Sequence, residues 1–322
     1  METTIWFWIV FNVVVIGLLA LDLGVFHRKT GTETVRESLI WSIVWIALAL
    51  GFNLGIYLYA GGEPALAFLS GYVIERSLAV DNIFVFMLIF GAFAVPRELQ
   101  HRVLFWGIIG ALVLRGALIG SGSFLIERFE WVLYIFGAFL VLTALRMLRQ
   151  KEQEIDPGNH AVVRLVRRLV PVTEGYRASR FFVRQMGKVW VTPLFVVLAI
   201  IGVSDLIFAL DSIPAVFAVT RDPFLIYTSN IFAVLGLRAM YFLLAGVVGQ
   251  FHLLKYGLAV VLGFVGIKML VAGIYHIPIG LSLGIIVSVL LTSILLSRWF
   301  PERDPEIGSA VAEGVPVVGK AH

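Results

Sequence analysis

The nine residues Glu75–Ile83, ERSLAVDNI, correspond to a second stretch 130 positions later, DLIFALDSI at Asp205–Ile213. Each copy has two acidic residues six positions apart, and the second acid is followed by a polar residue and an isoleucine. Two further blocks follow each copy in the same order. They are GALVLR (110–115) against AVLGLR (233–238), and FEWVLYIFGAFLVLTALRML (129–148) against FHLLKYGLAVVLGFVGIKML (251–270). Agreement in order and spacing over three segments predicts an internal repeat of a three-helix unit.

The composition indicates a membrane protein. Of 322 residues, 60% are hydrophobic and 14% are charged, and the mean hydropathy is +0.95. Apolar runs of roughly 20 residues, enough helix to cross the ~30 Å hydrocarbon core, recur along the chain. Because the bilayer core offers no water to the backbone, and the alternation of a transmembrane β-barrel is missing, these runs are predicted to be helices. The fold class is an all-α polytopic membrane protein with about nine transmembrane helices, at 5–26, 37–60, 65–94, 103–122, 130–148, 193–219, 225–247, 253–273 and 278–300.

Lysine and arginine residues predict the orientation. Nineteen of them fall in connections on one side of the membrane and two on the other, while four lie within or near spans. The positive-inside rule then places the N-terminus in the periplasm and the C-terminus in the cytoplasm of a bacterial inner membrane. The polar stretch 149–192 is cytoplasmic, and its segment VVRLVRRLV (162–170) is typical of a basic amphipathic helix lying on anionic headgroups. We favour a solvated linker with this interfacial helix over a partner-docking domain.

The repeat and the orientation together predict inverted units. Each unit has three spans, an odd number, and the linker does not cross, so the units begin on opposite sides of the membrane. Secondary transporters use such inverted repeats, with the substrate site near the bilayer midplane at the repeat interface. The predicted division is two N-terminal helices (1–60), repeat one (65–148), the basic linker (149–192), repeat two (193–273), a last transmembrane helix (278–300) and a disordered cytoplasmic tail (301–322).

Several classes of function are disfavoured. The chain has no cysteine, which excludes disulfides, thiolate metal sites and cysteine nucleophiles. Gly314–Lys320 has the GxxxxGK spacing of a phosphate loop, but Ala321 replaces the required Ser or Thr and no strand precedes it. HExxH and GxSxG motifs are absent, and the basic residues lie in loops between spans. We expect neither an enzyme nor a nucleic-acid-binding protein, and no permanently bound cofactor.

The acids inside the apolar runs are the strongest functional signal. A carboxylate at the bilayer centre costs roughly 2.5–3.5 kcal/mol on insertion scales, so each one suggests function. Six residues advance a helix by ~9 Å and ~600°, which leaves the two acids of a copy ~120° apart unless the helix is unwound. Pro214 cannot donate to the carbonyl of Leu210. The sequence therefore predicts a departure from regular helix around Leu210–Pro214, with a freed carbonyl beside Asp211.

Oxygen ligands of this kind suit hard divalent cations such as Mg²⁺, Ca²⁺ or Mn²⁺. The predicted site comprises Glu75, Asp81, Asn82, Asp205, Asp211 and Ser212. The competing interpretation is that the acids only pair with two intramembrane arginines to hold helices together. Four acids exceed those arginines, so we favour a cation pathway in which Arg115 and Arg238 have structural or counter-ion roles. Three further polar residues are secondary candidates for the pathway, although an interfacial or helix-bridging role is preferred for each: Asp22, Asn53 and Asn230.

At these residues the chain resembles the TerC family of integral membrane proteins, and most closely its Alx-like manganese-exporter branch. The matching stretches are LDLGVFHRK (21–29), ERSLAVDNIFVF (75–86), SDLIFALDSIPAVFAVTRDPF (204–224), TSNIFAVLGLRAMYFLLAGV (228–247), LKYGLAVVLGFVGIKML (254–270) and YHIPI (275–279). The resemblance implies Mn²⁺ efflux, with Ca²⁺ for some relatives, and an acidic site on the four acids named above. One position departs from the pattern, because many relatives have Glu where this chain has Gly202.

The function predicted from the sequence is therefore secondary transport that exports Mn²⁺, with the metal as substrate. Outward movement of a divalent ion against an inside-negative potential costs ~4.6 kcal/mol per 100 mV. Carboxylates that exchange a proton for the metal can couple this movement to inward H⁺. Two alternatives stay open: a non-transporting membrane scaffold or assembly factor, and a Ca²⁺-handling transporter of the same fold.

Overall fold

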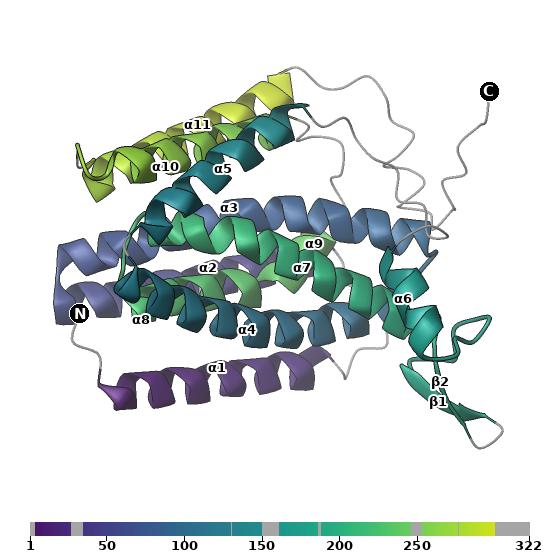
Figure 1. Cartoon of the computed structure of the whole chain (residues 1–322). Coiled ribbons are helices and arrows are strands. Elements are labelled where there is room, and N and C mark those ends of the chain that lie inside the picture. Colours follow the sequence, from purple (N-terminus) through teal and green to yellow (C-terminus); the bar gives the residue numbers. More distant parts are fainter. Residues whose placement is uncertain are drawn as a thin grey trace.

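The computed structural model describes residues 4–26, 35–129, 131–149, 161–185, 188–245, 253–275 and 277–299. This part of the chain is mostly helical (Figure 1). Its helices are α1 Ile5–Phe26, α2 Val35–Ala60, α3 Gly62–Ala92, α4 Arg97–Arg128, α5 Val132–Arg149, α6 Ala161–Leu169, α7 Pro193–Phe217, α8 Pro223–Leu235, α9 Leu237–Ala245, α10 Leu254–Val271 and α11 Ile279–Trp299, and its strands are β1 Phe182–Gln185 and β2 Lys188–Val191. The predicted disordered tail at 301–322 lies outside the described residues.

The helices confirm a polytopic all-α membrane protein. Among the described residues, six helical stretches are long and apolar enough to cross a bilayer: α2, α4, α5, α7, α8 with α9, and α11. Shorter apolar helices lie at Ile5–Leu21 and Tyr256–Val271. Helix α3 is long, with 31 residues, but carries several charged side chains along its length. Each predicted span coincides with a helical stretch, while nine crossings remain a prediction.

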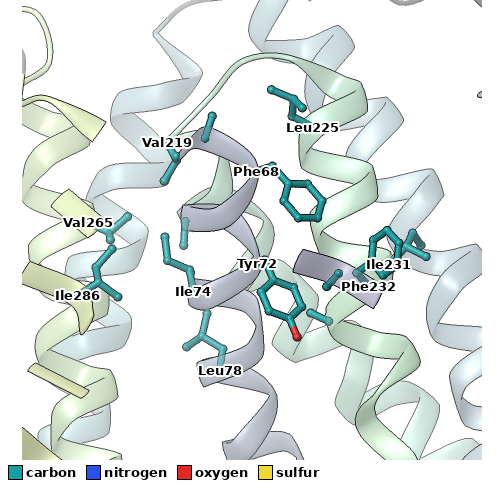
Figure 2. Packing of buried hydrophobic residues seen from close by; sticks show 14 of the residues in the cluster. Phe68, Tyr72, Ile74, Leu78, Val219, Leu225, Ile231, Phe232, Val265 and Ile286 are labelled. Atoms are coloured by element: carbon teal, nitrogen blue, oxygen red, sulfur yellow. The ribbon is translucent and has the colours of Figure 1, made fainter. Parts of the chain in front are cut away.

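Helix α3 is the central element of the bundle. It contacts α2, α7, α8 and α11, so both of its sides are covered by protein. Figure 2 shows Phe68 and Tyr72 on one side of α3, toward Ile231 and Phe232 of α8. Ile74 and Leu78 lie on another side, toward α10 and α11. A residue in the middle of α3 is therefore shielded from lipid.

The predicted irregularity at Pro214 is wrong. Helix α7 continues through Pro214 to Phe217, so it accommodates the single donor that the proline lacks without ending there. The break lies instead between α8 and α9, at Gly236. A Cβ atom at Gly236 would collide with the guanidinium of Arg76 on α3. That guanidinium donates to the carbonyl of Ala233 at 3.0 Å. In a continuous helix this carbonyl would accept from the N–H of Leu237, so Arg76 provides a donor in its place.

Helices α5 and α10 approach each other closely through two glycines. A Cβ atom on Gly137 would lie 2.9 Å from the carbonyl oxygen of Gly266, and one on Gly266 would lie 2.8 Å from that of Gly137. Small residues of this kind allow helix backbones to pack closely in membranes. The contacts advance in opposite directions, because Gly263 lies against Ala144 while Gly266 lies against Gly137. Helices α5 and α10 are therefore antiparallel.

The segment between α5 and α7 contains a helix and a hairpin. Helix α6 lies within the segment predicted to be an interfacial helix, whereas the antiparallel pair β1–β2 was not predicted. Four-residue strands are too short to show a period-2 pattern reliably. Val162, Val163 and Val166 of α6 pack against the bundle, where the helix contacts α7. The basic and apolar side chains left exposed on α6 are Arg164, Leu165, Arg168 and Leu169.

Candidate functional site

A group of polar side chains is buried in the middle of the bundle, which we call the central polar cluster. Its members come from α3, α4, α7 and α8, and each is at most 3% exposed. They are Glu75, Asn82, Arg115, Asp205, Ser212 and Asn230. Buried polar groups require partners, so this set is costly to place in a membrane unless it has a use.

Arg115 of α4 connects the two acids of the cluster. Its Nε donates to Oδ2 of Asp205 at 3.3 Å, and its Nη2 donates to Oδ1 of the same carboxylate at 3.0 Å. Its Nη1 pairs with Oε1 of Glu75 and donates to Oδ1 of Asn230 at 3.1 Å. One guanidinium therefore contacts both carboxylates and the amide oxygen, in the two-pronged geometry that arginine forms with carboxylates.

Helical periodicity explains which polar residues meet. Glu75 and Asn82 are seven residues apart on α3, and Asp205 and Ser212 are seven apart on α7, so each pair lies two turns apart on one face. Helices α3 and α7 contact each other, and Ser212 Oγ donates to Oε1 of Glu75 at 3.2 Å. The structure thus brings together three of the six predicted site residues, Glu75, Asp205 and Ser212, while Asn82 is buried on the same face of α3 two turns from Glu75.

A tight approach of α3 to α8 brings Asn230 to the cluster. A Cβ atom on Gly71, one turn before Glu75, would lie 2.8 Å from Oγ of Ser229. Only a residue without a side chain permits this separation. The neighbouring Asn230 is completely buried and reaches Arg115. The helix-bridging role preferred for Asn230 from the sequence fits this contact, and the same contact places it in the candidate site.

The remaining predicted acids are arranged differently. Asp211 is partly buried, and its Oδ1 accepts a hydrogen bond from Thr143 Oγ1 of α5 at 3.2 Å. It lies about 100° around α7 from Ser212, away from the face that carries the central polar cluster. Asp81 lies in α3, but its side chain is outside the described residues. The structure therefore does not test whether Asp81 approaches Asp211, and this approach stays a prediction.

Three polar atoms of the central polar cluster have no hydrogen-bond partner in the described structure. They are Oε2 of Glu75, Oδ1 of Asn82 and Nδ2 of Asn230. A buried polar atom without a partner costs about 1–3 kcal/mol. Two of the three are oxygens of the kind that bind hard cations. The cluster therefore has acceptor capacity beyond that used by Arg115.

A small, mostly apolar pocket adjoins the cluster at Asp205. Gly107, Ile108 and Ala111 of α4 line it, together with Ile201 of α7 and residues from α3 and α9. These α4 residues precede Arg115 by one to two turns, and long side chains on a helix lean toward its N-terminus. The pocket therefore lies on the side of α4 toward which Arg115 leans.

The other sequence candidates lie apart from this arrangement or cannot be placed in it. Asn53 of α2 is half-buried, and its Oδ1 has no partner among the described residues. Asp22 belongs to α1, but its side chain is outside the described residues. Arg238 is buried in α9, 5% exposed. The described residues contain no group of three or more His, Asp or Glu side chains able to hold a metal, so a cation here needs amide and hydroxyl oxygens as well.

Two contacts at the site were not predicted. Thr143 is the partner of Asp211, and its repeat equivalent is the apolar Val265, so the repeat contains no signal for it. Arg76, one of the four basic residues within or near the predicted spans, supports the break between α8 and α9. The available clue in the sequence is Gly236, which stands in AVLGLR at the position where GALVLR has Val113.

Comparison with known proteins agrees with these features. The model of the integral membrane protein TerC family matches residues 60–305. A protein of Escherichia coli strain K12 named Alx, described as a proposed membrane-bound redox modulator, is 49% identical over 305 residues, covering 92% of this chain and 95% of that protein. Its namesake in Photorhabdus laumondii is 46% identical over 301 residues, covering 91% and 94%. No solved structure matches. With a family model matching most of its length and relatives of this similarity, the chain belongs to the TerC family of integral membrane proteins.

Proposed function

We propose that this protein is a secondary transporter that exports Mn²⁺ from the cytoplasm through the central polar cluster. The observation that carries the proposal is the meeting of Glu75 and Asp205, one acid from each repeat unit, in the interior of a membrane protein. Carboxylate, amide and hydroxyl oxygens form a hard ligand set, which suits Mn²⁺ or another hard divalent cation. The metal is the substrate and is not a resident cofactor.

The helix contacts support an inverted repeat. Helices α3, α4 and α5 correspond to α7, α8 with α9, and α10, and each packs against its own equivalent: α3 on α7, α4 on α8, and α5 on α10. The contact of α3 with α8 is matched by that of α4 with α7, as a two-fold relation between the units requires. The antiparallel α5–α10 pair fits units of opposite orientation. We therefore retain the proposal of nine spans with the site at the repeat interface.

The direction of transport determines the energy source. Export against an inside-negative potential needs an opposing gradient, and proton entry supplies one when a carboxylate exchanges H⁺ for the metal. The proposed orientation places the N-terminus in the periplasm and the C-terminus in the cytoplasm of a bacterial inner membrane. In that orientation the exposed Arg164, Leu165, Arg168 and Leu169 of α6 lie on the cytoplasmic side, where they can meet anionic headgroups.

A scaffold remains the second candidate, and one observation favours it. Arg115 contacts both carboxylates of the cluster, as it would in a purely structural brace. A redox role, which the names of the relatives suggest for those proteins, would here have to proceed without thiol chemistry, because this chain has no cysteine. The two candidates differ in whether the acids are needed for ion movement.

The test is metal movement by purified protein in proteoliposomes that enclose a Mn²⁺-sensitive dye. Asp205→Asn keeps the size of the side chain and removes its charge, and we expect it to lower the Mn²⁺ flux at least about tenfold, the effect of ~1.4 kcal/mol. Glu63→Gln, in the exposed first turn of α3, is the matched control and should transport normally. A wild-type protein that moves no Mn²⁺ under a proton gradient would leave the scaffold as the better proposal.

A further inference from the structure

The central polar cluster already contains a cation of the protein itself. Arg115 is fully buried, and its guanidinium takes one oxygen of Glu75, both oxygens of Asp205 and the amide oxygen of Asn230. A hard divalent ion would need the same oxygens, at ~2.0–2.6 Å from its centre. A divalent ion on these oxygens would lie within a few ångströms of the guanidinium, where the two cations repel each other strongly. Pairing by Arg115 and binding of the substrate therefore exclude each other.

We propose that Arg115 is an internal substitute for the substrate, which neutralises the carboxylates while the site holds no metal and is displaced when a divalent cation binds. The inference rests on the proposed function, because it assigns a competitor to the same site. It differs from a purely structural role for Arg115, since a structural brace would remain in place during transport.

The charges explain why exchange is feasible in both directions. Two buried carboxylates without a partner are strongly unfavourable, so an empty site needs a cation to remain folded. A guanidinium brings one positive charge to the two carboxylates, whereas a divalent ion brings two. Oε2 of Glu75 has no donor in the presence of Arg115, and a metal would add it to its ligands. The divalent ion thus gains interactions that Arg115 leaves unused.

A small pocket beside the cluster lies next to Arg115, but it has room for only about one water molecule, so displacement of the guanidinium needs local movement of α4 or α7. The pocket at Asp205 is lined by Gly107, Ile108 and Ala111, which precede Arg115 on α4. The side chain of Arg115 leans in this direction along the helix.

A second buried arginine offers a matched control. Arg76 follows Glu75 in the sequence, but its Nη1 donates to the backbone carbonyl of Ala233, and its guanidinium lies against Gly236. Its removal takes one positive charge from the same region without uncovering the oxygens of Glu75 and Asp205. Comparing Arg115→Gln with Arg76→Gln therefore separates displacement from a general change of charge.

The experiment measures Mn²⁺ binding by isothermal titration calorimetry on full-length wild type, Arg115→Gln and Arg76→Gln in detergent at pH 8. Export is then measured in proteoliposomes. If Arg115 competes with the metal, Arg115→Gln binds Mn²⁺ at least about tenfold more tightly, or ~1.4 kcal/mol, and exports it more slowly because release is impaired. Arg76→Gln raises the affinity much less, because Arg115 still occupies the oxygens of Glu75 and Asp205 in that variant.

The outcomes separate this inference from the proposed function. Wild-type protein that neither binds nor moves Mn²⁺ refutes the proposed function. Wild-type protein that binds Mn²⁺, together with unchanged or weaker binding by Arg115→Gln, overturns the displacement by Arg115 alone. Loss of folding cannot produce a gain of affinity, and if Arg115→Gln is not monodisperse, Arg115→Lys keeps the charge and loses the two-pronged contact. It should then bind more tightly than wild type, and weaker or equal binding counts against displacement.

Discussion

Replacing Gly236 by alanine tests the junction between α8 and α9. We expect this substitution to lower the free energy of unfolding when Arg76 is present, and to leave it unchanged or raise it when Arg76 is absent. In wild type, Arg76 donates to the carbonyl of Ala233, which would accept from Leu237 if the helix were continuous. A Cβ at position 236 would lie 2.9 Å from Nη2 and 3.0 Å from Cζ of Arg76, too close for the guanidinium to stay. Loss of a charge-assisted hydrogen bond costs about 1.5–3 kcal/mol. Alanine recovers about 1 kcal/mol through helix propensity, so we expect net destabilisation of about 0.5–2 kcal/mol.

The same substitution should behave differently when Arg76 is absent. In an Arg76→Ala background no guanidinium obstructs position 236, and Gly236→Ala should be neutral or stabilising by up to about 1 kcal/mol. The coupling in the double-mutant cycle is then about 0.5–3 kcal/mol. Unfolding free energies from SDS titration in mixed micelles would measure it. Equal destabilisation by Gly236→Ala in both backgrounds would refute the account of this junction.

Four further predictions concern transport, topology and the cytoplasmic segment. Asp211→Asn should abolish Mn²⁺ tolerance in cells without other exporters while membrane abundance is unchanged, and normal tolerance would remove Asp211 from the pathway. Reporter fusions at position 160 should locate it in the cytoplasm, and a periplasmic signal would overturn the orientation. Gly202→Ala should fold at normal abundance, because a Cβ there meets no atom within 4 Å, and aggregation would contradict this. Burial raises the pKa of Tyr176, which donates to the carbonyl of Phe93, to about 12. Since the neutral phenol is the favoured form, its contribution to stability should be complete below pH ~10 and lost toward pH 12, so the stability difference from Tyr176→Phe should shrink over that range.

The sequence predicted the helical elements well because their signals are local. Apolar runs of bilayer length fix each helix, and the observed boundaries lie within a few residues of most of the predicted ones. Pro214 misled the prediction, because a proline removes one hydrogen bond and crowds one turn, which a helix can accommodate without a break in its assignment. The short hairpin between α6 and α7 was missed for a different reason. Its strands have four residues each, too few for a recognisable period.

The candidate site was predicted only in part because it depends on contacts between helices. The repeat identified Glu75 and Asp205 as equivalent positions, and helical geometry correctly separated Asp205 and Asp211 onto different faces of α7. A single sequence does not show which face of α7 points into the bundle, since either of its two acids could have pointed inward. Close packing through Gly71 decided the contribution of Asn230, and an interhelical glycine contact has no distinctive pattern in the sequence.

The arrangement of Arg115 is a poor design for a brace and a good one for an exchange site. A brace is most stable when every buried donor and acceptor is satisfied, and apolar packing often serves better than a buried ion pair. Here two carboxylates share one guanidinium, while an oxygen of Glu75 and the oxygen of Asn82 have no donor among the described residues. Such unused acceptors lower stability in a site that is always occupied by arginine. The same unused oxygens can bind a divalent cation that replaces Arg115. Their cost to stability is therefore what the proposed transport of a divalent ion would lead us to expect.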